Sequence, residues 1–352
     1  MKSIIHERPG VYSSYDASAA VRGGRAVRTI GVAAKSTGGT ANTAVMLTSY
    51  EMGLSAFGED AAGTAGMSAI LKLLFLGGAS TVAAVKVDGE DYESAFAVLQ
   101  SVEDAQIIVC DSGDLAVQQT LRTSLENASA ARRERIAVVG MSGASTAELT
   151  ERARELNSER MALVGPDGLD GTGKTLPGIF AAAAVAAAVA VTRDPAVPLN
   201  GTQLSGLTGV SEDYGDNEID LLVRGGVTPL EAAGGVVSPV RGITTRTMTG
   251  GVNDTTWREL TTIMIVDDVI PTIRQSLRSR FSQTKNTVQT RGAIRAQTIV
   301  ELERKLRAEI IDSYSDVVVS PCEEDPTVCL VEFSFSVAHG LNQIYLTAHI
   351  TI

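Results

Sequence analysis

Short segments rich in Val and Ile alternate with longer helical segments from residue 82 to residue 191, and this alternation limits the fold more than any other feature. Strands that are buried on both faces have near-continuous apolar sequences, and intervening helices of this length allow parallel neighbours. The pattern therefore predicts an α/β fold with a mostly parallel sheet and helices on both faces. The expected strands are 28–34, 82–87, 106–110, 136–140 and 160–165, and the expected helices are 65–76, 90–100, 116–131, 145–157 and 177–192.

Two local signals predict where helices end and begin. Gly77 and Gly78 should terminate the helix over 65–76, because glycine tolerates the left-handed conformation at a helix C-terminus. Ser145 and Glu148 have the spacing of a capping box at a helix N-terminus. The stretch 201–226, by contrast, is typical of loops with short strands.

Composition excludes several classes of function. The chain has 352 residues, enough for two domains, and its formal net charge of −11 argues against direct nucleic-acid binding. The apolar run 179–191 is too short to span a bilayer, so we expect no membrane association. Residues 1–10 lack the apolar core of a secretory signal, which indicates synthesis in a cytoplasm.

Cysteines and histidines are few and lack the spacing of a metal site: Cys110, Cys322, Cys329, His6, His339 and His349. No metal or other cofactor is therefore expected. A Ser-His-Asp triad is also excluded, because every histidine lies outside the predicted α/β region.

The C-terminal region contains two segments that alternate between apolar and polar residues. Such alternation indicates strands with one buried face, because side chains on a strand point to opposite faces in turn. In 328–337 the apolar set includes Val331, Phe333, Phe335 and Val337; in 343–352 it is Ile344, Leu346, Ala348, Ile350 and Ile352. The second strand needs a pairing partner, either in its own subunit or in another one.

The stretch 269–300 has a positive charge that runs against the acidic total of the chain. It contains no acidic residue and six basic ones: Arg274, Arg278, Arg280, Lys285, Arg291 and Arg295. Such a stretch favours an acidic partner surface, and the alternative is a solvated helix face.

Residues Gly168–Thr175 (GLDGTGKT) match the phosphate-binding loop pattern, with Lys174 and Thr175 in the positions that contact phosphate and magnesium. Against a nucleotide site, Gly168 trails the end of the predicted strand, and Pro177 interrupts the helix that should carry Lys174. A surface loop is the alternative interpretation, and an α/β nucleotide-binding protein is the alternative function.

Several stretches resemble contractile phage tail sheath proteins in order and spacing. In the C-terminal third these are 250–260 (GGVNDTTWREL), 267–270 (DDVI), 278–281 (RSRF) and 338–346 (AHGLNQIYL); further ones are 6–12 (HERPGVY) and the Pro-Leu crossing at 194–201 (DPAVPLNG). The resemblance implies a subtilisin-like outer α/β domain and an α+β C-terminal assembly domain with extended N- and C-terminal arms.

The resemblance also implies a domain division and a set of assembly strands. An N-terminal arm would occupy 1–25, the outer domain 26–235, the inner assembly domain 236–342, and a strand donated to a neighbouring subunit 343–352. The self-assembly residues would be Val11, Tyr12, Val331, Phe333, Phe335, Ile344, Leu346 and Ile350. The six basic residues of 269–300 become candidates for the surface that faces the tube.

The implied function is structural and not enzymatic. The subunit would polymerise as stacked hexameric rings around a tail tube and contract to drive the tube through a target cell envelope. Its partners would be other copies of itself, the tube protein, and the baseplate and tail terminator proteins. It would assemble in the host bacterial cytoplasm and end in a virion tail, or in a related device such as a tailocin or a secretion-type sheath.

Overall fold

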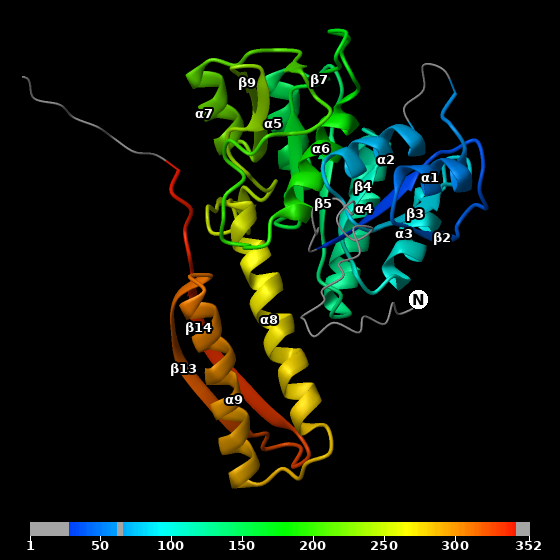
Figure 1. The fold of residues 1–352 in the computed structure, drawn as a ribbon. Helices are drawn as coiled ribbons and strands as arrows, with labels where there is room; N and C mark the ends of the chain where they lie inside the picture. Colours follow the sequence, from blue (N-terminus) through cyan, green and yellow to red (C-terminus); the bar gives the residue numbers. More distant parts are fainter. Residues whose placement is uncertain (1–27, 62–65, 343–352) are drawn as a thin grey trace, which may run out of the picture.

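The computed structural model describes residues 28–61 and 66–342 (Figure 1). The predicted N-terminal arm, with Val11 and Tyr12, and the predicted terminal strand, with Ile344, Leu346 and Ile350, lie outside the described residues.

An eight-stranded sheet forms the centre of the larger lobe, in the order β10-β9-β6-β5-β4-β1-β3-β2. Its six inner strands are parallel to one another, and each edge strand is antiparallel to the strand beside it. The mostly parallel sheet predicted from the sequence is thus confirmed. The strands are β1 Thr29–Ala34, β2 Ala44–Leu47, β3 Val82–Lys86, β4 Ala105–Cys110, β5 Ile136–Gly140, β6 Met161–Gly165, β9 Val227–Ala233 and β10 Val236–Pro239.

Helices cover both faces of this sheet, as the alternating pattern predicts. On one face lie α1 Tyr50–Phe57, α2 Met67–Leu76 and α6 Gly178–Val191; on the other lie α3 Tyr92–Ser101, α4 Leu115–Ala130, α5 Thr146–Leu156 and α7 Asp216–Arg224. Successive strand residues enter opposite cores. In β4, Ile107 and Val109 join the core beneath α6, whereas Ile108 joins the core beneath α3 and α4.

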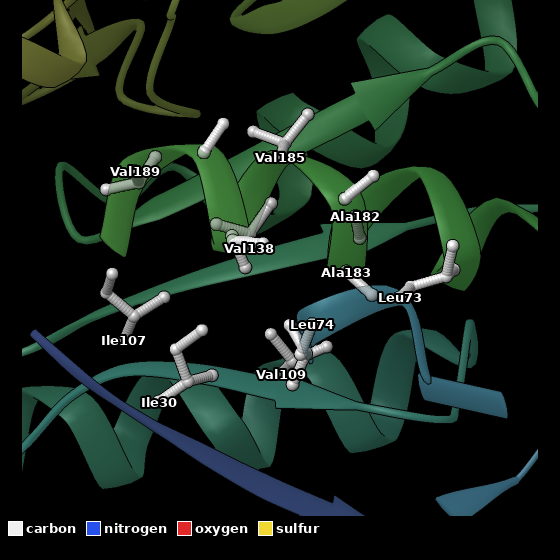
Figure 2. Packing of buried hydrophobic residues seen from close by; sticks show 14 of the residues in the cluster. Ile30, Leu73, Leu74, Ile107, Val109, Val138, Ala182, Ala183, Val185 and Val189 are labelled. Atoms are coloured by element: carbon white, nitrogen blue, oxygen red, sulfur yellow. The ribbon is translucent and has the colours of Figure 1, made fainter. Parts of the chain in front are cut away.

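The alanine-rich helix α6 lies unusually close to the sheet and to α2 (Figure 2). A Cβ atom added to Gly140, at the end of β5, would lie 2.1 Å from the carbonyl oxygen of Gly178. One added to Gly77 would lie 2.4 Å from Cβ of Ala187. Small residues at these positions bring backbones together, and this close packing compensates for a sequence in which only 4% of residues are aromatic.

The predicted helix ends have the expected geometry, but the helices α1 and α7 were missed. At α5, Ser145 Oγ accepts a hydrogen bond from the Glu148 amide, and Glu148 Oε2 accepts one from the Ser145 amide at 2.9 Å. Gly78 has a φ of 94°. The stretch 201–226 contains the short strand β8 Gly209–Val210, as expected. It also contains α7, which was predicted as loop because the apolar face of this helix consists only of Ile219, Leu222 and Val223, too few residues to show a clear helical period.

The C-terminal residues form a second, narrow lobe of two helices and a β-hairpin, which extends away from the first (Figure 1). Its elements are α8 Leu260–Phe281, α9 Val288–Arg307, β13 Ile311–Pro321 and β14 Cys329–Val337. Its core is small: Ile265, Val269, Ile273, Leu302, Ile311 and Val317. We call residues 28–259 the body and residues 260–342 the stalk. Strand β13 was not anticipated from the sequence.

The passage from body to stalk occurs within α8. The boundary expected at 235/236 falls inside the β9–β10 hairpin, since β10 is paired with β9 in the large sheet. The first turns of α8 still belong to the core beneath α6, through Leu260, Ile263 and Met264. The helix therefore joins the two lobes as one continuous element.

Candidate assembly surface

The β13–β14 hairpin is the part of the stalk best suited to accept another strand. Among the described residues each of its two strands is paired on one side only, so an edge of backbone donors and acceptors is open on each. An open edge is a site where a further strand can add by backbone hydrogen bonding.

The two faces of β14 differ in burial. Val331, Phe333, Phe335 and Val337 are half-buried, and the intervening residues are exposed. Phe333, Phe335 and Val337 pack against the stalk core, and the rings of Phe333 and Phe335 stack with centroids 6.2 Å apart. The alternation in the sequence thus corresponds to an inner face directed at α8 and α9.

A β-bulge in β13 is held in place by α9. The pairing register shifts between Ser315 and Val318, and Asp316 has a φ of 55°. The Nε atom of Arg295 donates a hydrogen bond of 2.7 Å to the carbonyl oxygen of Val317. One of the six basic candidates is therefore a structural clamp on the hairpin.

Three more of the basic candidates also have partners within the chain. Arg274 forms an ion pair with Glu134 of the body, with Nη2 and Oε1 2.5 Å apart. Arg280 donates to Oε1 of Gln297 at 2.5 Å, and Arg291 donates to Oδ1 of Asn286 at 2.9 Å.

Arg278 and Lys285 remain. Both are exposed, and neither side chain has a hydrogen-bond or ion-pair partner in the part of the chain that the structure describes. The structure therefore does not bring the six basic residues together as one surface, and it leaves these two available to a partner.

A set of ion pairs fixes the stalk to the body, and sequence reasoning missed it. Arg160, just before β6, binds Asp267 of α8 through two contacts, Nη1–Oδ2 at 2.8 Å and Nη2–Oδ1 at 3.1 Å. Burial raises the pKa of Asp267, and the guanidinium of Arg160 opposes that shift. A cavity of about 150 Å³ lies at the same joint, and charged groups of both lobes line it: Arg28, Glu134, Arg193, Asp267 and Asp268. Because the two partners lie so far apart in the chain, no local sequence pattern could have predicted this ion pair.

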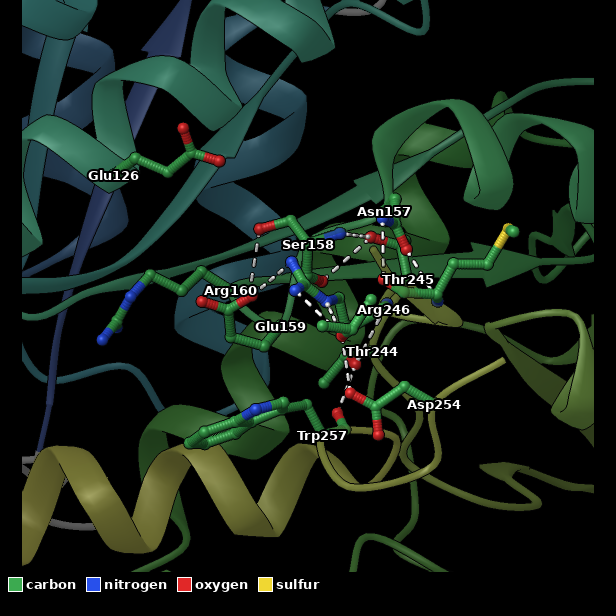
Figure 3. A network of polar contacts seen from close by, with 12 residues as sticks. Glu126, Asn157, Ser158, Glu159, Arg160, Thr244, Thr245, Arg246, Asp254 and Trp257 are labelled. Carbon is green, nitrogen blue, oxygen red and sulfur yellow. Dashed lines mark hydrogen bonds and ion pairs between the residues drawn. The ribbon is translucent and has the colours of Figure 1, made fainter. Parts of the chain in front are cut away.

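Neutral hydrogen bonds hold the segment before α8 against the turn between α5 and β6 (Figure 3). Thr245 Oγ1 accepts from the Ser158 amide and donates to the Ser158 carbonyl, both at 3.0 Å. Asn157 Oδ1 accepts from the amides of Thr247 and Met248 at 3.1 and 3.0 Å. These bonds lie within the body and fix the segment that leads to α8, whereas the ion pair of Arg160 with Asp267 joins the body to α8 itself.

In the loop that matches the phosphate-binding pattern, the side chain of Asp170 takes the place that a phosphate would occupy. Asp170 Oδ1 accepts hydrogen bonds from the amides of Thr172 and Lys174, at 2.8 and 3.0 Å, and from the Thr172 hydroxyl at 2.6 Å. Amides that would cradle a phosphate are thus already bonded to a carboxylate. Helix α6 begins only at Gly178, beyond Lys174, so the lysine is not in its first turn. This geometry does not support the alternative of nucleotide binding.

Within residues 28–61 and 66–342 no group of three or more His, Cys, Asp or Glu side chains could hold a metal ion. The described helices include none that is long and apolar enough to cross a membrane.

Comparison with known proteins identifies two family matches. The sequence matches the phage tail sheath protein central domain over residues 85–245 and the phage tail sheath C-terminal domain over residues 252–351. Together these matches cover about three quarters of the chain.

Two phage proteins are similar in sequence. The tail sheath protein of Bacillus phage SP01 is 31% identical over 224 residues, which is 62% of this chain and 38% of that protein. The tail sheath protein of Mycobacterium phage Bxz1 is 29% identical over 164 residues, or 42% of this chain and 28% of that protein. The matched part thus spans less than two fifths of either relative.

Solved structures share the fold along nearly the whole chain. A chain of the anti-feeding prophage baseplate has a TM-score of 0.74 at 14% identity and covers 99% of this chain and 100% of its own length. One from the contracted helical sheath of the same particle has a TM-score of 0.73 at 16% identity and covers 98% and 99%. A sheath tail protein of Desulfitobacterium hafniense has a TM-score of 0.70 at 12% identity and covers 93% and 100%. At these identities the likeness concerns the fold.

Proposed function

This chain belongs to the phage tail sheath family, and on that premise we propose that it polymerises around a tail tube and contracts to drive the tube through a cell envelope. The observation that carries the proposal is the β13–β14 hairpin, whose strands have open edges and run along the lobe that extends from the body (Figure 1). We propose stacked hexameric rings as the arrangement, with the tube, baseplate and tail terminator proteins as partners. Assembly would take place in the host cytoplasm, before incorporation into a virion tail or a related particle.

Strand addition is the link that we propose between subunits. Residues 1–25, with Val11 and Tyr12, and residues 343–352, with Ile344, Leu346 and Ile350, would add to the hairpin of a neighbouring copy. A contact of this kind joins different surfaces of two identical subunits, so repeated copies of it form a closed ring where the rotation closes and a helix where it does not.

The energetics favour a cooperative lattice. Burial of each large apolar side chain contributes roughly 1.5–3 kcal/mol, whereas fixing each backbone residue of a donated strand costs about 1–2 kcal/mol. The two amounts nearly cancel for a ten-residue strand, so one link is weak and many are needed. Contraction would then require no fuel, because the extended lattice is a trapped state of higher free energy than the contracted one.

Substitutions on the two faces of the terminal segment 343–352 test the proposal. Leu346→Asp and Ile350→Asp should abolish tubes or rings in negative-stain micrographs, whereas the matched changes Thr347→Asp and Thr351→Asp on the opposite face should have a smaller effect. Deletion of residues 343–352 should leave a folded monomer that forms no tubes. A truncated protein that melts well below the full-length monomer would instead indicate that the segment folds within its own subunit.

Contact with the tube is proposed for the six basic residues of 269–300, chiefly Arg278 of α8 and Lys285 of the loop between α8 and α9, whose side chains have no partner among the described residues. Reversing both charges should weaken co-assembly with tube protein. Lys174→Glu, which changes an exposed lysine of the body, is the matched control. Equal co-assembly of both variants would contradict a role in tube contact.

A further inference from the structure

Residues 338–342, which we call the strap, follow β14 and connect the stalk back to the body. The Ala338 amide still donates to the carbonyl oxygen of Ile310 at 3.2 Å, so the strap leaves the hairpin directly after this bond. In Figure 1 the strap leads away from the hairpin toward the body. At its end, Asn200 Nδ2 of the body donates a hydrogen bond of 2.8 Å to Oδ1 of Asn342.

The body holds the strap with the segment Pro198–Asn200, which we call the seat. Leu199 anchors the seat, because its side chain is only 3% exposed and belongs to the core beneath α6. A Cβ atom added to Gly340 would lie 2.8 Å from Cγ of Pro198 and 3.0 Å from Cβ and Cδ of the same ring. The backbone of the strap therefore lies directly against a rigid proline, and a residue larger than glycine does not fit.

The side chain of Asn200 contributes little to the stability of the fold. Its Oδ1 atom is buried and has no donor among the described residues, an arrangement that costs free energy. The bond to Asn342 is the one that its amide group makes within the described part of the chain, and Asn342 is exposed, so water could replace it as a partner. Holding the strap is the use that the structure shows for this side chain.

A seated strap keeps residues 343–352 away from their own hairpin. From Asn342 they would have to turn and run back along the whole strap before they reached Val337. The return would use about five of these ten residues and the turn about two more, so about three would remain to pair with β14. Release from the seat removes this barrier, because 338–342 has the length of a common hairpin loop.

We propose that the seat positions the terminal segment for strand addition: it directs residues 343–352 to the hairpin of a neighbouring copy and prevents them from pairing with their own. Fixing the strap also limits the volume that the segment explores, which raises its effective concentration at the neighbour. The inference rests on the proposed function, since it requires that this segment is donated between copies.

Asn200→Ala removes the hydrogen bond between seat and strap, and His339→Ala, at an exposed residue of the same strap, is the matched control. Asn200→Ala should raise the protein concentration needed for polymerisation on the order of tenfold, which corresponds to about 1.4 kcal/mol per contact. The control should polymerise at the wild-type concentration. The Asn200→Ala monomer should melt no lower than the wild type, because the change also removes a buried acceptor without a donor.

Gly340→Ala tests the contact from the side of the strap, since the new Cβ would displace the strap from Pro198. Amide hydrogen exchange of the monomers then reports where the terminal segment goes. Protection of β14 should rise in Gly340→Ala and in Asn200→Ala relative to the wild type, because the released segment pairs with its own hairpin. Deletion of residues 343–352 from either variant should abolish this rise.

Two results would overturn the inference: polymerisation of both variants at the wild-type concentration, or no gain in β14 protection in either monomer. A lower melting temperature of Asn200→Ala together with normal polymerisation would likewise show that the seat is an ordinary structural contact. Failure of the wild-type protein to polymerise at any concentration would instead contradict the proposed function, and the exchange measurement on monomers would still decide whether the seat directs the segment.

Discussion

The ion pair between Arg160 and Asp267 should contribute to stability only as a pair. It connects the body to α8 across a separation of 107 residues, and the side chains of Arg160 and Asp267 are only 12% and 15% exposed. We therefore predict a strong coupling between Arg160→Met and Asp267→Leu in a double-mutant cycle.

The expected loss of stability in each single variant depends on the charge that remains buried without its partner. In Asp267→Leu the guanidinium of Arg160 retains a hydrogen bond of 3.2 Å to the carbonyl of Arg135 but loses the carboxylate with which it pairs. Removing one member of a buried pair typically costs about 3–5 kcal/mol, whereas replacing both with apolar residues of similar size is often neutral. We expect a loss of about 3 kcal/mol for each single variant and less than about 1 kcal/mol for the double variant.

The pH dependence has a defined sign. Burial raises the pKa of Asp267 above its unfolded value despite Arg160, so the folded protein binds a proton there more readily than the unfolded chain does. The contribution of this carboxyl to stability is present below its unfolded pKa and is lost as pH rises through its folded pKa. Relative to the double variant, wild-type stability should therefore fall over that interval and stay level above it.

Urea unfolding followed by circular dichroism, with hydrogen exchange at the start of α8, would measure these differences. Single losses that add up in the double variant would refute the reasoning, because additivity means that the two charges do not interact. A wild-type protein that gains stability relative to the double variant as pH rises from 3 to 6 would refute the sign of the pKa shift.

Three further predictions concern the packing and the helix ends. Gly140→Ala should destabilise the protein by about 1–3 kcal/mol, because the new Cβ would lie 2.1 Å from a backbone oxygen; Gly171→Ala, with nothing within 4 Å, is its control in thermal melting. Glu301→Ala should cost about 1–3 kcal/mol in urea unfolding, since Gln297 would lose a buried acceptor at 2.6 Å. Ser145→Ala should cost about 1 kcal/mol through loss of the cap of α5, and amide exchange in the first turn of α5 should rise.

A further pH effect accompanies the Glu301 variant. Burial acts to raise the pKa of Glu301, but hydrogen bonds from Ser276 and the ion pair with Arg304 outweigh it and hold the pKa below its usual value. The stability that this carboxyl provides should be lost as pH falls through its folded pKa, and the wild type and Glu301→Ala should then converge. Curves that stay parallel down to pH 3 would contradict this.

The sequence by itself determined most of the inner strands of the body, the helices between them and their layering, but not α1, α7, β2, β9 or β10. A strand between two helical layers must be apolar on both faces, so β4, β5 and β6 are visible as short apolar runs within a residue or two of their ends. The capping box at Ser145 is equally local, because it depends on residues three positions apart. The C-terminal alternation likewise identified β14 before its partner was known.

Tertiary structure alone decided what these elements contact. The sequence of β13 carries Asp312, Ser313, Ser315 and Asp316 and does not alternate cleanly; it is a strand because β14 and α9 pair and pack with it. The sequence does not distinguish Arg274 from Arg278, yet only Arg274 forms an ion pair, with the carboxylate of Glu134. Local patterns record burial and backbone preference, which depend on near neighbours. Contacts between residues more than a hundred positions apart depend on how whole elements pack, and no local pattern specifies them.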